Sequence, residues 1–128
     1  MVFKGFSRTF STADNKQYET IGEYWDIMSA LYGRENLRGL GYNWTMDTIE
    51  YVIGLKSNEF FDMDMMDLEM HWKEISLPDT GWKEYHGITE KLDTLYERIY
   101  QDGILTYEIE EFSEDGLCKI LITRDRGL

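Results

Sequence analysis

Cysteine and basic residues are scarce in this chain, and long apolar runs are missing. The sole cysteine, Cys118, cannot form an intrachain disulfide, so nothing suggests an oxidising compartment. The N-terminal sequence MVFKGFSRTF lacks the apolar core of roughly 7–15 residues that a secretory signal needs. No stretch approaches the roughly 20 apolar residues of a transmembrane helix. We therefore expect a cytoplasmic protein that does not enter a membrane.

The shortage of bases leaves a strongly acidic chain. Thirteen Lys and Arg residues stand against 25 Asp and Glu residues, which gives a formal net charge of −12. Such a surface repels phosphate backbones, and the bases form no dense cluster, so we expect no binding of nucleic acid. The same charge would attract a cationic small molecule or a basic protein partner.

Aromatic residues, in contrast, are abundant. Four Trp, nine Tyr and six Phe make up 15% of the 128 residues. These rings must either fill a core or line a cavity. The length fits a single domain, 1–128, because typical domains run roughly 100–150 residues.

One order of elements occurs twice along the chain. In each half a strand-like run precedes a helix with an apolar stripe, and two strand-like runs follow it. In the first half these are Val2–Arg8, a helix over Tyr18–Tyr32 that ends at Gly33, Arg38–Trp44 and Thr48–Leu55. In the second they are Trp82–His86, a helix around Leu92–Ile99, Ile104–Phe112 and Leu117–Thr123.

This repeat predicts an α+β fold made of two strand–helix–strand–strand modules related by a pseudo-twofold axis. The modules span about 1–57 and 71–128, and they share one antiparallel-rich sheet with both helices on one face. An acidic, Met-rich connector, 58–70, joins them. Its Asp62 and Asp64 do not form a calcium loop, because Met66 and Asp67 stand where an EF-hand needs an oxygen ligand and a glycine. The sequence indicates no metal site and no cofactor.

Alternation along Ile104–Phe112 predicts which side chains share a face of the sheet. Leu105, Tyr107 and Ile109 are apolar and are assigned to the helix-covered face. Glu108, Glu110 and Phe112 then lie on the opposite, uncovered face. Two carboxylates and a ring there form either a solvated surface or the floor of a ligand site.

Three segments resemble the gyrase-inhibitor-like (GyrI-like) effector-binding domain, which also occurs in AraC-type and multidrug-sensing regulators. The first is Glu50-Tyr51-Val52-Ile53-Gly54-Leu55, and the second is LPDTGWKEYHG, from Leu77 through Pro78 to Gly87. The third is Ile109-Glu110-Glu111-Phe112 with the hairpin that follows it. The resemblance extends from Phe3 to Thr123. It implies a stand-alone sensor domain whose ligand channel lies on the sheet face away from the helices.

The resemblance also implies that the carboxylate of Glu110 meets the positive charge of a lipophilic cation. The neighbouring candidates are one more carboxylate and a set of rings: Glu108, Phe112, Trp82, Tyr42, Trp44 and Trp72. Aromatic faces suit this ligand class because they attract cations by about 0.5–2 kcal/mol each. Trp25 and Tyr51 are assigned to the core, since their spacing places them among apolar neighbours.

The sequence therefore predicts a small-molecule-binding domain for lipophilic cations. Two alternatives remain open. One is a GyrI-like hydrolase of reactive small molecules, in which Glu110 or Glu108 acts as a general base. The other is an acidic module that binds a basic protein partner. The identity of the ligand and the oligomeric state stay undetermined at this point.

Overall fold

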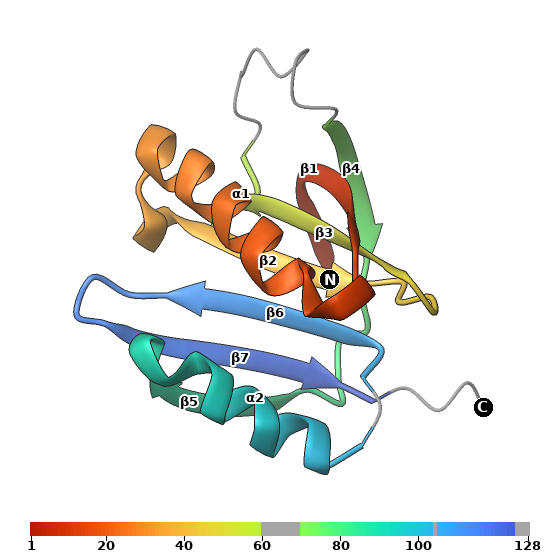
Figure 1. Ribbon diagram of the computed structural model, residues 1–128. Helices are drawn as coiled ribbons and strands as arrows, with labels where there is room; N and C mark the ends of the chain where they lie inside the picture. The colour runs from red at the N-terminus through yellow and green to blue at the C-terminus, as the bar shows by residue number, and fades with distance from the viewer. Residues whose placement is uncertain (60–69, 104, 125–128) are drawn as a thin grey trace.

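Seven strands and two α-helices make up the part of the chain that the structure describes, residues 1–59, 70–103 and 105–124 of a computed structural model (Figure 1). The helices are α1 (Gln17–Tyr32) and α2 (Leu92–Gln101). The strands are β1 (Val2–Ser11), β2 (Leu37–Tyr42), β3 (Thr48–Leu55), β4 (His71–Ser76), β5 (Lys83–Ile88), β6 (Tyr107–Phe112) and β7 (Leu117–Thr123). The predicted α+β fold is confirmed.

All seven strands form one antiparallel sheet in the order β4-β1-β3-β2-β6-β7-β5. The two modules of the repeat meet where β2 pairs with β6. Reading outwards from that seam, the first module runs β2, β3, β1 and the second runs β6, β7, β5. Equivalent strands thus occupy mirrored places in the sheet order, as the doubled element order predicts.

Strand β4 has no counterpart in this scheme. It follows the predicted connector, of which residues 60–69 lie outside the described residues, and it pairs with β1 of the first module. The sequence analysis missed this strand. Its residues, His-Trp-Lys-Glu-Ile-Ser, mix apolar and charged side chains and lie at the sheet edge, where only one side of the backbone needs a pairing strand.

Both helices cover the same face of the sheet, α1 over the first module and α2 over the second (Figure 1). The buried stripe of α1 consists of Tyr24, Trp25 and Met28, and that of α2 of Leu95, Tyr96 and Ile99. Gly33 ends α1 as predicted, with φ of 83° and its N–H donating to the Ser29 carbonyl at 2.9 Å. Within the described ranges, no helix is long and apolar enough to cross a membrane.

The face away from the helices is also covered, contrary to the sequence-based expectation. It carries a second apolar cluster made of Phe3, Leu40, Val52, Leu77 and Ile109, with Trp82 packed against it. Leu77 and Trp82 belong to the connection between β4 and β5, which passes behind the sheet in Figure 1 because those strands lie at opposite edges. The sheet therefore has an apolar core on each side.

The assignment of faces on β6 was wrong for this reason. Ile109 packs in the cluster away from the helices, whereas Phe112 packs in the helix-side cluster. Glu108 and Glu110, which share the parity of Phe112, therefore lie under the helices. Alternation fixes which residues share a face, but two apolar cores leave no solvated face to show which side is which.

Two glycines bring β1 and β3 unusually close together. A Cβ atom added to Gly54 would overlap the backbone oxygen of Lys4, and one added to Gly5 would overlap that of Ile53. Both obstacles are backbone atoms of paired strands, which cannot rotate away as a side chain can. Gly22 on α1 differs, because a Cβ there would meet no atom within 4 Å.

We predict opposite effects of alanine at these two kinds of glycine. Gly54→Ala should lower the free energy of unfolding by about 1–3 kcal/mol, since the strands must separate to admit the methyl group. Gly22→Ala should raise it by about 0.5–1 kcal/mol, since alanine costs less backbone entropy in a helix. Urea unfolding of both variants measures this. A Gly54→Ala protein as stable as the parent would contradict the close approach of β1 and β3.

Candidate functional site

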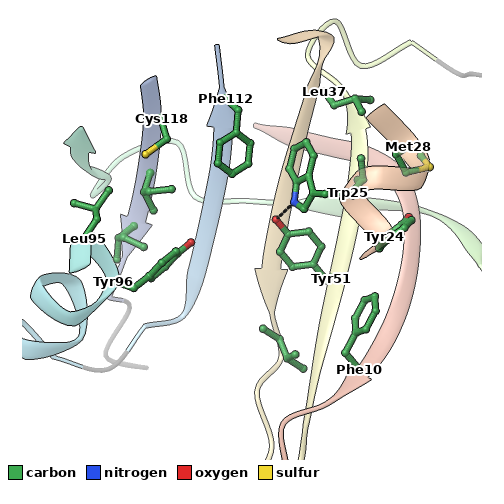
Figure 2. Packing of buried hydrophobic residues seen from close by; sticks show 14 of the residues in the cluster. Phe10, Tyr24, Trp25, Met28, Leu37, Tyr51, Leu95, Tyr96, Phe112 and Cys118 are labelled. Carbon is green, nitrogen blue, oxygen red and sulfur yellow. Dashed lines mark hydrogen bonds between the residues drawn. The ribbon is translucent and has the colours of Figure 1, made fainter. Parts of the chain in front are cut away.

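A cavity of about 290 Å³ lies between the two helices and the sheet. Its wall is mainly aromatic and aliphatic, and it includes one guanidinium and three carboxylates, of which two are buried and one, Asp93, is exposed. The lining residues are Gln17, Tyr18, Ile21, Gly22, Trp25, Arg34, Trp44, Ile49, Tyr51, Leu92, Asp93, Tyr96, Tyr100, Glu108, Glu110 and Phe112. Both modules contribute to it. Figure 2 shows Trp25 and Tyr51 of the first module facing Tyr96 and Phe112 of the second.

A chain of hydrogen bonds crosses the seam between the modules at this cavity. The indole N–H of Trp25 donates to the Tyr51 hydroxyl at 2.8 Å (Figure 2). That hydroxyl in turn donates to Oε1 of Glu110. Each buried polar atom in the chain thus has a partner, and the last acceptor is a carboxylate, where hydrogen bonds are strongest.

Glycines on β2 make room for this arrangement. Gly39 pairs with Glu110 and Gly41 pairs with Glu108 across the β2–β6 seam. A Cβ on Gly39 would overlap the Tyr51 hydroxyl, and one on Gly41 would lie 2.9 Å from Oε1 of Glu108. Tyr51 on β3 therefore reaches Glu110 on β6 only because the strand between them has no side chain in its path.

Glu108 is less well satisfied than Glu110. It is 5% exposed, and its Oε2 atom is buried without a hydrogen-bond partner among the described residues. The buried hydroxyl of Tyr96 likewise has no hydrogen bond of good geometry there, although it lies close enough to Glu110 to lower that carboxyl's pKa. In the described part of the chain, no Lys, Arg or His forms an ion pair with either glutamate.

Burial has the largest effect on the pKa of both carboxyls. Loss of solvation raises the pKa of Glu108 well above its usual value, and the neighbouring charge of Glu110 raises it further. Burial also raises the pKa of Glu110, but the hydrogen bond from Tyr51 and the charge of Arg34 oppose this. Burial and the neighbouring charge thus favour the neutral form of Glu108 more strongly than that of Glu110, whose carboxylate form is supported by Tyr51.

Arg34 supplies the positive charge at the rim of the cavity. Its guanidinium carbon lies 4.4 Å from the centroid of the Phe112 ring and 5.7 Å from that of Trp25. The residue is exposed, so solvent screens its charge. Two buried carboxyls thus stand against one solvated base.

Four of the residues predicted from the sequence come together at the cavity: Glu110, Glu108, Phe112 and Trp44. They were expected on an uncovered face away from the helices, and that placement is corrected here. The GyrI-like resemblance implies a ligand channel on the face away from the helices, whereas this cavity lies beneath them.

The other three predicted rings lie elsewhere. Tyr42 is on the opposite face, stacked on Tyr107 with ring centroids 6.3 Å apart. Trp82 packs on the same face, and its indole N–H donates to the Pro78 carbonyl at 2.7 Å. Trp72 on edge strand β4 contacts Phe6 edge-to-face, with centroids 5.3 Å apart, and does not line the cavity.

Sequence reasoning missed Trp25, Tyr51 and Tyr96 as cavity residues. Trp25 and Tyr51 are buried in the core, as expected from their spacing, but each also presents an edge to the cavity. Glycines at alternate positions of the central strand, Gly39 and Gly41, were the available signal. Two small residues on one face of a strand indicate that neighbouring side chains cross it.

The fold and the site define an α+β domain with a buried, ring-lined acidic cavity. Comparisons with protein-family models, with curated proteins and with solved structures find no match. Among the residues that the structure describes, no three His, Cys, Asp or Glu side chains are placed to hold a metal ion. The chemistry of the cavity itself therefore carries the functional argument.

The burial of Glu108 predicts a pH-dependent stability difference. A carboxyl whose pKa is higher in the folded state stabilises the fold fully below its unfolded pKa and loses that contribution as the pH rises. The parent should therefore lose stability above about pH 4.5, whereas Glu108→Gln lacks this loss. Urea unfolding should show the variant gaining about 1–3 kcal/mol on the parent between pH 4.5 and pH 8. A pH-independent difference would contradict the burial of this carboxyl.

Proposed function

We propose that this protein binds a small lipophilic cation in the cavity between its helices. The carboxylate of Glu110 and its neighbour Glu108 lie opposite the positive charge, and the rings around them contact the apolar part of the ligand. The observation that carries the proposal is two carboxyls buried in the wall of one aromatic cavity, with no basic ion-pair partner in the described part of the chain.

Electrostatics favour a cation over a neutral or anionic ligand here. Two like charges in one low-dielectric site cannot both ionise without a large cost. Ionisation of one carboxyl therefore opposes ionisation of the other, and a bound cation stabilises the ionised form of both. The formal charge of −12 adds a long-range field that draws cations towards the molecule.

The dimensions of the cavity fit a small ligand. About 290 Å³ lies near the lower end of the roughly 300–1,000 Å³ of ligand pockets. Trp25, Trp44 and Phe112 supply faces and edges for cation–π and apolar contacts. This arrangement agrees with what the GyrI-like resemblance implies for the role of Glu110, and the family assignment itself stays a prediction.

Hydrolysis is a second candidate, favoured by the different environments of the two carboxyls. Tyr51 donates to Glu110 and supports its carboxylate form, while Glu108 is pushed towards the neutral acid. A base and an acid on one strand face are the groups that general acid–base catalysis requires. Catalysis would show as turnover that Glu108→Gln and Glu110→Gln both abolish, whereas pure binding would show saturation without product.

We predict that cationic dyes bind more tightly than anionic dyes of similar size. Trp25 and Trp44 line the cavity, so quenching of intrinsic tryptophan fluorescence reports occupancy. Glu110→Gln keeps the shape but removes the charge, and should weaken binding of the cationic dye about five- to thirty-fold. This follows from the roughly 1–2 kcal/mol by which charge-assisted contacts exceed neutral ones.

Glu111→Gln is the matched control for this experiment. Glu111 adjoins Glu110 on β6 but lies on the opposite face, with its carboxylate 3.8 Å from Lys56 and 4.0 Å from Lys119. Its variant should bind the dyes like the parent. Equal affinities for cationic and anionic dyes, or equal losses in the two variants, would count against the proposal.

A further inference from the structure

Three buried polar atoms in the cavity wall have no hydrogen-bond partner among the described residues: Oε1 of the half-buried Gln17 on α1 and two deeper atoms, which carry the argument. The deeper atoms are Oε2 of Glu108 on β6 and the hydroxyl oxygen of Tyr96 on α2. Both residues are more than nine-tenths buried, at 5% and 7% exposure, and both line the same cavity. An unpaired buried polar atom destabilises the protein, so the two deeper atoms around this cavity point to a bound group that pairs with them.

The donors of Tyr51, Trp25 and Arg34 make no hydrogen bond to Oε2 of Glu108. The Tyr51 hydroxyl donates to Glu110, and the Trp25 N–H donates to Tyr51. Arg34 lies over the Phe112 ring, and within residues 1–59, 70–103 and 105–124 it forms no ion pair with either glutamate. Oε2 of Glu108 is thus an unpaired acceptor in the cavity wall, and the Tyr96 hydroxyl lies near Glu110 without a hydrogen bond of good geometry.

We infer that the cavity takes a cation that carries N–H donors, such as an amidinium, a guanidinium or a protonated primary amine. It should discriminate against quaternary ammonium and phosphonium ions of similar size. This inference rests on the proposed function and specifies its ligand class.

The expected preference follows from the hydrogen-bond donors and acceptors of the two side chains and of the ligand. An ionised carboxylate only accepts hydrogen bonds, and a phenol oxygen can accept one as well. A forked N–H cation can donate to Glu108 and to Tyr96 while its charge is balanced by the carboxylates. A quaternary ammonium ion brings the same charge but no donor, so both oxygen atoms stay unpaired when it binds.

The test compares benzamidinium with phenyltrimethylammonium, which share one ring and one positive charge. Isothermal titration calorimetry on the full chain gives both dissociation constants. We expect the parent to bind benzamidinium at least about tenfold more tightly, the size of effect that one charge-assisted hydrogen bond produces. Neutral benzamide, which keeps the shape and the N–H groups, should bind more weakly than benzamidinium.

Two variants tie the preference to the two unpaired atoms. Glu108→Gln should narrow the ratio of the two affinities to about threefold or less. Tyr96→Phe keeps the ring and loses only a hydroxyl that makes no hydrogen bond of good geometry in the protein, so it should fold like the parent and narrow the ratio about two- to fivefold. Glu111→Gln on the opposite face should leave the ratio unchanged.

The outcomes separate this inference from the proposed function. If the parent binds both cations equally, the inference fails and cation binding stands. If it binds neither cation, the proposed function fails and the inference with it. If the preference exists but survives both Glu108→Gln and Tyr96→Phe, the two atoms are not its source and the assignment is overturned.

Discussion

The structure is organised around the removal of two adjacent same-face carboxyls, Glu108 and Glu110, from water. A buried carboxyl is costly unless hydrogen bonds or opposite charges compensate it. Here the compensation for Glu110 comes from the other module, through Tyr51 and behind it Trp25. The docking of α1, the path of Tyr51 across the sheet and the lack of side chains at Gly39 and Gly41 of β2 all make that one contact possible.

The pseudo-twofold arrangement explains where this can happen. Strands β2 and β6 are equivalent in the two modules and pair with each other at the seam. On β2 the positions that face the helices are Gly39 and Gly41, and their partners on β6 are Glu110 and Glu108. The two strands thus keep a similar backbone path but carry different side chains. The glycines on β2 provide the space that the glutamates on β6 need.

A cavity remains because each helix packs on its own module. Trp25 from α1 and Tyr96 from α2 approach the seam from opposite sides, and neither fills the space above β2 and β6 (Figure 2). The result is a low-dielectric cavity in which an uncompensated charge is strongly destabilising, so the charged groups in its wall indicate which ligands can bind. A surplus of buried acid in such a chamber favours a cationic ligand or acid–base chemistry, and both depend on the same two side chains.

The sequence by itself determined the strand–helix–strand–strand order of each module, the sharing of a face by Glu108, Glu110 and Phe112, and the overall α+β class, because these follow from local periodicity. It did not determine which face that was. Solvation normally reveals the inner side of a strand, but the connection from Leu77 to Trp82 covers the far side of this sheet and removes that clue. Nor could it show that Trp25 and Tyr51, assigned to the core, also border the cavity, or that β4 adds an edge strand. Those features depend on contacts between residues far apart in the sequence: 26 positions from Trp25 to Tyr51, 59 from Tyr51 to Glu110, and 76 from Met1 to Leu77. Only the tertiary structure brings such residues together.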